Sequence, residues 1–152
     1  ATHQLIGVYD PALTEPLANV LGELGSEGAF VVHSHDGMDE LTTGGPNQVS
    51  HLKDSSVSTY ELNAADYGLH AACDEDMSGA DPEDNAKKMR ALLSGEETGP
   101  CRDVVLFNAA AALSLTTDSF ETALDEATQS LESGTALQKL DALAAMSQRL
   151  VV

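Results

Sequence analysis

The sequence predicts an α/β protein with a partial central, mostly parallel sheet, a β-hairpin and a helical C-terminal half. Three observations predict this class. A strand, a helix and a second strand follow one another within residues 3–33, two short strands of alternating polarity come next, and helical periodicity covers the chain from residue 81 onward. Sheet-forming segments therefore precede most of the helices, and a length of 152 residues suits one domain.

The first two strands are short apolar runs. Residues 3–9 are typical of a buried strand, which Asp10-Pro11 ends, and residues 28–33 form a second buried strand. Because a helix lies between them, the connection predicts a right-handed parallel crossover.

The helix between these strands is indicated by one apolar face over about residues 13–24. Thr14 is expected to cap it, with Pro16 in its first turn and Gly25 after its last residue. The apolar face consists of Leu13, Leu17, Val20, Leu21 and Leu24.

Two strands of alternating polarity, residues 48–53 and 57–62, predict a hairpin with its turn at residues 54–56, and residues 63–80 read as a loop. Asp81 before Pro82 is typical of a helix start, and that helix runs to about Ser94. An apolar helix over about residues 101–115 is expected to be buried. Two amphipathic helices follow at about residues 119–132 and 135–149.

The charge balance excludes several classes of partner. Seven Lys and Arg against 25 Asp and Glu give a net charge of −18 and a pI of about 4.2. Nucleic acids and anionic membrane surfaces require a cationic surface, so neither is an expected partner. No apolar run approaches the ~20 residues that span a bilayer. Adaptation to high salt is one hypothesis for so acidic a surface, and ordinary acidic solubility is the alternative.

Cys73 and Cys101 belong to no paired metal motif, which favours two free thiols in a reducing cytoplasm. The chain begins with Ala1 and enters its first strand within three residues, as expected of a piece cut from a longer protein.

Residues 32–41 hold two histidines and three carboxylates, a dense group of candidate ligands. This segment lies at the end of the second strand, where open α/β sheets bind ligands. Asp39 and Glu40 are adjacent carboxylates and therefore candidate ligands for Mg²⁺, which proteins hold with one or two carboxylates. Asp36-Gly37 supplies the bend before them. A chance Asp-Glu pair is the alternative in so acidic a chain.

Three other patterns have weaker support. His33 and His35 could point to one face and bind zinc with Asp36, His51 or His70, but a structural His33 and a solvated His35 are favoured. Residues 74–85 match part of a calcium loop, yet Asn85 stands where the bidentate Glu is required, which favours an acidic loop before a helix cap. Residues 42–46 are rich in glycine, and a turn is favoured over a phosphate loop because the Walker lysine is lacking.

A series of short segments covers nearly the whole chain. They are residues 4–10, 13–18, 31–33, 36–40, 44–46, 66–69, 81–86, 93–96 and 108–113. Each alone is weak, but their order and spacing resemble the C-terminal part of the anthranilate phosphoribosyltransferases, enzymes of tryptophan biosynthesis.

This resemblance implies a catalytic domain of the nucleoside phosphorylase/phosphoribosyltransferase type that joins anthranilate to 5-phosphoribosyl-1-pyrophosphate. It implies that Asp39 and Glu40 bind Mg²⁺ at the pyrophosphate, and that the full-length form is a cytoplasmic homodimer. The family's glycine-rich donor loop, its Lys-His-Gly-Asn segment, its anthranilate-contacting Arg and its N-terminal helical domain lie upstream, outside residues 1–152. We therefore assign no catalytic or substrate-binding residue and expect the isolated chain to be inactive.

Two other functions remain open. A nucleoside phosphorylase would have a similar domain and would be identified by phosphorolysis of a nucleoside. A non-catalytic acidic module could keep the fold and bind a partner.

Overall fold

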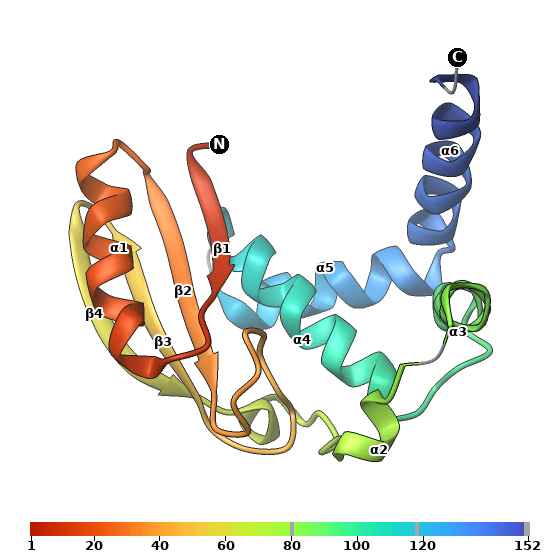
Figure 1. Ribbon diagram of the computed structural model, residues 1–152, viewed down its shortest axis with the longest axis horizontal. Helices are drawn as coiled ribbons and strands as arrows, with labels where there is room; N and C mark the ends of the chain where they lie inside the picture. The colour runs from red at the N-terminus through yellow and green to blue at the C-terminus, as the bar shows by residue number, and fades with distance from the viewer. Residues whose placement is uncertain (80, 118, 151–152) are drawn as a thin grey trace.

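The first 62 residues build a four-stranded sheet in the order β1-β2-β3-β4 (Figure 1). The computed structural model describes residues 1–79, 81–117 and 119–150. Its strands are β1 (His3–Gly7), β2 (Gly28–Ser34), β3 (Asn47–Lys53) and β4 (Ser56–Leu62).

The predicted α/β class is confirmed, but the sheet is mixed rather than mostly parallel. β1 and β2 are parallel, whereas β2–β3 and β3–β4 are antiparallel. A parallel pair needs a crossover, and within residues 1–62 only one helical crossover joins two strands. The predicted hairpin is confirmed, with Asp54 and Ser55 both at positive φ (49° and 62°) in its turn.

The crossover helix α1 (Thr14–Glu23) is confirmed, but its predicted cap was wrong. Asp10 instead caps a preceding 3₁₀ turn, η1 (Pro11–Leu13), by accepting a 2.9 Å hydrogen bond from the Ala12 amide. Thr14 already lies inside the helix, where its hydroxyl donates to the Pro11 carbonyl at 3.0 Å. Asp10 followed by Pro11 is itself a strong helix start, so helical structure begins at Pro11, before the expected cap at Thr14.

Each face of the sheet is covered by one helix. On one face Ala18 and Leu21 of α1 pack with Ala29, Val31 and Leu52. On the other face helix α4 (Pro100–Ser114) buries Phe107 and Ala111. Their partners from the strands and the following loop are Phe30, Val32, Leu41, Val49 and Leu62. Strand β2 is therefore buried on both sides, which explains its uninterrupted apolar run.

The C-terminal helices are confirmed and form their own cluster. Helices α3 (Pro82–Ser94), α4 and α5 (Phe120–Glu132) share a core of Leu92, Leu106, Ala127 and Leu131. Helix α6 (Thr135–Leu150) extends away from the sheet (Figure 1). Residues 63–79 contain a 3₁₀ turn, η2 (Ala64–Tyr67), and a short helix, α2 (Asp74–Met77), where the sequence predicted only loop.

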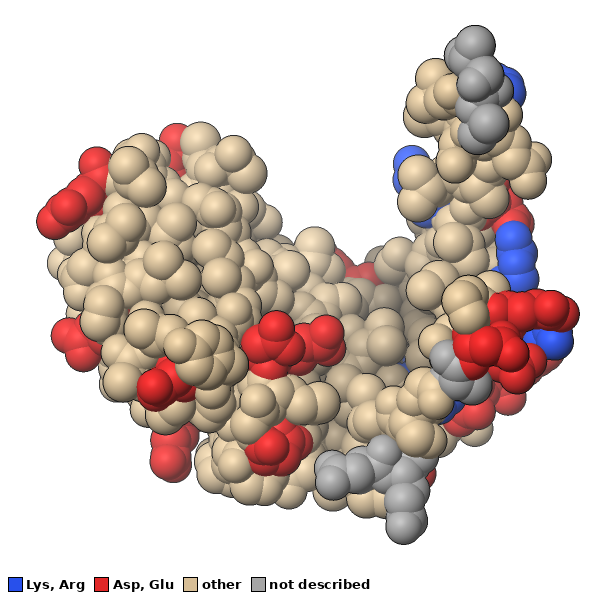
Figure 2. All heavy atoms as spheres, viewed as in Figure 1, with Lys and Arg blue, Asp and Glu red and all other residues tan. Residues whose placement is uncertain are grey.

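Charged side chains are unevenly distributed. Figure 2 shows acidic groups over both the sheet and the helices, whereas basic groups on this face lie on the helical part. No helix in the described part of the chain is long and apolar enough to cross a membrane.

Candidate functional site

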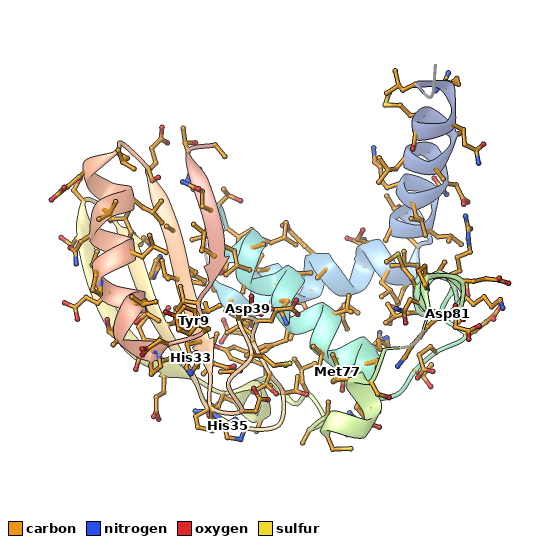
Figure 3. All side chains as sticks on the ribbon, viewed as in Figure 1. Tyr9, His33, His35, Asp39, Met77 and Asp81 are labelled. Atoms are coloured by element: carbon orange, nitrogen blue, oxygen red, sulfur yellow. The ribbon has the colours of Figure 1, made fainter. Side chains whose placement is uncertain are left out.

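The candidate site is the loop of residues 35–46, which joins β2 to β3 at the carboxyl ends of the parallel pair. Figure 3 shows Tyr9, His33, His35 and Asp39 around these strand ends. The loop opens with a tight turn, in which the Ser34 amide donates to the Met38 carbonyl at 3.2 Å and Gly37 takes a φ of +91°. A residue with a side chain is strained at that φ, so the predicted bend is confirmed.

Asp36 closes this turn. Its carboxylate accepts from the Ser34 hydroxyl and, at 3.2 Å, from the Met38 amide. Partial burial raises the pKa of Asp36, but these hydrogen bonds outweigh it and hold the pKa below its ordinary value. Asp36 is therefore an ionised group that builds the turn.

Asp39 and Glu40 follow the turn with exposed side chains. Among the described residues, neither carboxylate has a hydrogen bond or an ion pair with protein. The main chain of Asp39 crosses β1 at Gly7, so closely that a Cβ on Gly7 would lie 1.5 Å from the Asp39 carbonyl oxygen. The carboxylates are thus free, while the backbone that carries them is tightly enclosed.

Asn108 of α4 holds the next residue of the loop. Its Oδ1 accepts from the Leu41 amide at 3.0 Å, and its Nδ2 donates to the Leu41 carbonyl at 2.8 Å. Sequence reasoning did not single out Asn108. A lone amide at the start of the apolar stretch 108–113 is the signal that could identify it.

Asn47 fixes the far end of the loop from the first position of β3. It is fully buried; its Oδ1 accepts from the Thr42 amide at 2.8 Å, and its Nδ2 donates to the Thr42 and Leu62 carbonyls. Residues 42–46 therefore form a turn into β3, as the sequence favoured. At Gly44 a Cβ would lie 2.8 Å from the Ala72 carbonyl oxygen, so the turn also packs against the loop before α2.

The two histidines of the zinc hypothesis have other surroundings. His33 is half-buried, and its Nδ1 lies 2.8 Å from the Val8 carbonyl oxygen. His35 is exposed, with its ring over Gly45. His51 stacks edge-on to Phe30. The contact of His33 and the exposure of His35 favour the structural alternative. The described residues contain no group of three His, Cys, Asp or Glu arranged to hold a metal.

His70, the remaining candidate zinc ligand, contacts a carboxylate on α4. Its Nδ1 and its backbone amide both lie 2.8 Å from Oδ2 of Asp103, a nearly buried side chain. This contact fastens the loop before α2 to the same helix that carries Asn108.

Two carboxylates of the partial calcium loop accept hydrogen bonds from backbone amides. Asp76 accepts from the Cys73 amide at 2.9 Å, and Asp81 caps α3 by accepting from the Glu83 and Asp84 amides. The side chain of Asp74, the first position of that pattern, lies outside the described residues. The favoured reading, an acidic loop before a helix cap, agrees with these contacts.

Residues 1–137 match a protein family described as glycosyl transferase family, a/b domain. The chain belongs to this glycosyl transferase family. Family members named anthranilate phosphoribosyltransferase include those of Rhodospirillum rubrum, 46% identical over 92% of this chain, and Moorella thermoacetica, 48% identical over 93%. The chain spans only 41% and 42% of these two relatives.

Solved structures agree with the family assignment. Anthranilate phosphoribosyltransferase from Thermus thermophilus superposes with a TM-score of 0.83 at 35% identity. The Saccharomyces cerevisiae enzyme in complex with PRPP and Mg superposes with a TM-score of 0.81 at 27% identity. Each comparison covers 91% of this chain and 41% of the other.

The donor set of the loop suits one kind of cation. Mg²⁺ is usually held by one or two carboxylates, with waters and substrate phosphates completing its shell. Asp39 and Glu40 are adjacent, exposed and free of protein partners in the described structure, so they fit such an ion. Since no third acidic, histidine or cysteine ligand is grouped with them there, a cage made only of protein groups does not fit.

Proposed function

We propose that this chain is the C-terminal part of an anthranilate phosphoribosyltransferase, which transfers the phosphoribosyl group of 5-phosphoribosyl-1-pyrophosphate to anthranilate and releases pyrophosphate. Family membership and the names of the relatives support this activity. One observation links it to particular residues: the free Asp39-Glu40 pair stands on an enclosed loop at the carboxyl ends of β1 and β2.

Asp39 and Glu40 are the proposed ligands of Mg²⁺. When bound, this cation would offset the negative charge that develops on pyrophosphate as its bond to ribose C1 breaks. Asp36 is left out of the ligand set because its carboxylate already accepts two hydrogen bonds within the turn.

The charge of the chain supports a role for Asp39 and Glu40 in binding a cation rather than the substrates themselves. Before residue 73 the sequence has ten acidic residues and one basic residue, Lys53. The phosphoribosyl donor is an anion, so this surface repels it unless positive charge lies between them. Asp39 and Glu40 contribute by attracting that positive charge. We expect the other donor and anthranilate contacts to come from parts of the full-length enzyme beyond these residues.

The assembly and location of the enzyme are further parts of the proposal. We expect the full-length form to be a homodimer in the cytoplasm. Cys73 and Cys101 are free thiols, which suits a reducing compartment.

A chimera tests this function. The matching segment of the Rhodospirillum rubrum enzyme is replaced by this chain, and formation of phosphoribosylanthranilate is measured. We expect the chimera to form product and the isolated chain to form none. In the chimera, Asp39→Asn or Glu40→Gln should raise the Mg²⁺ concentration for half-maximal activity at least about tenfold. Glu23→Gln, at an exposed position of α1, is the charge-matched control.

Other outcomes would contradict the proposal in different ways. Product from the isolated chain would show that the missing segments are unnecessary. Phosphorolysis of a nucleoside in place of anthranilate transfer would favour a nucleoside phosphorylase. A folded chimera without either activity would favour the acidic interaction module.

A further inference from the structure

Asn108 is the one side chain of α4 that contacts both main-chain polar groups of a residue in the candidate loop. Both hydrogens of its amide nitrogen are used, one by the Leu41 carbonyl at 2.8 Å and one by the Val104 carbonyl at 3.0 Å. Its Oδ1 accepts from the Leu41 amide at 3.0 Å. A flipped amide would set oxygen against two carbonyl oxygens, so only one orientation satisfies these groups.

These contacts reach Glu40 through its peptide bond to Leu41. The Leu41 amide nitrogen is bonded to the Glu40 carbonyl carbon, so holding that nitrogen fixes the plane of the Glu40–Leu41 peptide. Leu41 itself is fully buried in the core beneath α4. The end of the Asp39-Glu40 segment is thereby joined to the most buried helix of the fold.

The other end of the segment is enclosed by different contacts. The Asp39 carbonyl lies against Gly7, and the Met38 carbonyl is held by the Ser34 amide and hydroxyl. The backbone is therefore fixed on both sides of two carboxylates that have no protein partner of their own in the described structure. A ligand pair on a mobile loop would lose binding energy to ordering that loop, and a fixed backbone avoids this cost.

We infer that Asn108 is a positioning residue for the metal-binding pair, setting the backbone from which Asp39 and Glu40 reach their cation. This inference rests on the proposed function. Asn108 touches neither carboxylate in the described contacts, and it acts through the Leu41 main chain. Outer groups that orient metal ligands commonly change metal affinity by 10–100-fold when they are removed.

The main test is a titration of the whole 152-residue chain with Mn²⁺, followed by paramagnetic broadening of the Asp39 and Glu40 amide NMR signals in 0.2 M KCl. Asn108→Ser keeps a hydroxyl that can bond the Val104 carbonyl one helical turn back, but it cannot reach Leu41. We expect it to weaken Mn²⁺ binding at this site about tenfold. Asn19→Ser is the matched control, because among the described contacts Asn19 makes one side-chain hydrogen bond, the equivalent bond to the Glu15 carbonyl.

A second measurement uses the unmodified chain and so does not depend on whether the variant folds. If Asn108 holds the metal-binding conformation, Mg²⁺ must by reciprocity stabilise the bond between Asn108 and Leu41. Hydrogen exchange of the Leu41 amide should therefore slow several-fold in Mg²⁺, while that of Leu52, in the other core cluster, stays constant.

The outcomes separate this inference from the proposed function. The positioning role would be overturned if folded Asn108→Ser bound Mn²⁺ with unchanged affinity. It would also be overturned if hydrogen exchange of the Leu41 amide were the same with and without Mg²⁺. Asp39→Asn and Glu40→Gln test the metal assignment separately. If they leave the local broadening intact, the metal assignment itself fails, whereas if they abolish it and Asn108→Ser does not, only the positioning role fails.

Discussion

At the scale of single residues, Gly7 decides whether the candidate loop can take its path. The chain at Asp39 occupies the space where a side chain on position 7 would stand, and the obstacle is backbone. A flexible side chain could move aside, but this carbonyl lies in a segment bonded at both ends. A single methyl group at position 7 would therefore displace the proposed ligand pair.

We predict that Gly7→Ala destabilises the chain by about 2 kcal/mol or more, since an overpacked site costs roughly 1–3 kcal/mol even where neighbours adjust. Gly22→Ala is the matched control. Its Cβ would lie 3.1 Å from the movable Leu52 Cδ1, and alanine gains up to about 1 kcal/mol inside a helix. Urea unfolding of both variants measures the difference. Equal stabilities would show that the Asp39 segment yields easily.

His51 is the residue whose protonation should be visible in stability. Burial first, and the nearby Lys53 second, hold the pKa of His51 below its ordinary value. The unfolded chain therefore binds this proton at a higher pH than the folded chain. The contribution of neutral His51 to the free energy of unfolding is therefore complete above about pH 7. It is lost as the pH falls through the ordinary histidine pKa of about 6.5 toward the lower pKa of the folded chain.

His51→Phe should remove this pH dependence of stability and keep an aromatic ring against Phe30. In the wild type the ring centroids of Phe30 and His51 are 4.4 Å apart, in an edge-on arrangement. We expect the stability of wild type relative to the variant to fall between about pH 7 and 5, by less than the ~1.4 kcal/mol per pH unit that one proton allows. Urea midpoints of both proteins across this range measure it. A constant difference would contradict the direction assigned to His51.

At the scale of elements, the helices and the hairpin could be predicted because their signals are local. Asp81 and Pro82 begin α3, and a turn at Asp54 and Ser55 joins β3 to β4. The direction of β3 against β2 could not be predicted in this way. It depends on how residues 35–46 return to the sheet, and contacts with Asn108, 67 positions from Leu41, help to hold that path.

In the candidate site, too, some residues could be predicted from local sequence and others could not. Asp39 and Glu40 could be selected from the sequence because acidic pairs after a strand, together with a family resemblance, are visible there. The groups that enclose them could not. Gly7 and Asn108 contact the segment from another strand and from a distant helix, so their importance emerges only when the chain is folded.

The β3–β4 hairpin offers a prediction for a whole element. Asp54 and Ser55 both have positive φ, a conformation for which Asn-Gly is the preferred pair. Asp54→Asn with Ser55→Gly should stabilise the chain by about 0.5–1 kcal/mol, because strain at these positions is relieved. Ser56→Gly, at the first residue of β4, should have the opposite sign. Thermal unfolding of the two variants checks this, and destabilisation by the Asn-Gly pair would contradict the turn geometry.

At the scale of the whole molecule, charge is the dominant feature. The lysines and arginines that form ion pairs in the described structure lie on the helices. Both side chains of Arg90–Asp141 are about half exposed, and in Arg102–Glu132 the carboxylate is the exposed partner. Exposed pairs contribute little, so they offset only a small part of the repulsion from a net charge of −18. Most of that repulsion must be screened by ions from solution.

We therefore predict that KCl stabilises the chain. The screening length falls from about 10 Å at 0.1 M to about 3 Å at 1 M, so repulsion between acids on neighbouring elements should fade over that range. The urea midpoint should rise between these concentrations. Glu23→Gln with Glu27→Gln, both exposed, removes two negative charges and should reduce the slope. A midpoint that does not change with KCl would leave ordinary acidic solubility as the explanation, whereas an equal rise in both proteins would assign the effect to a cause other than these charges.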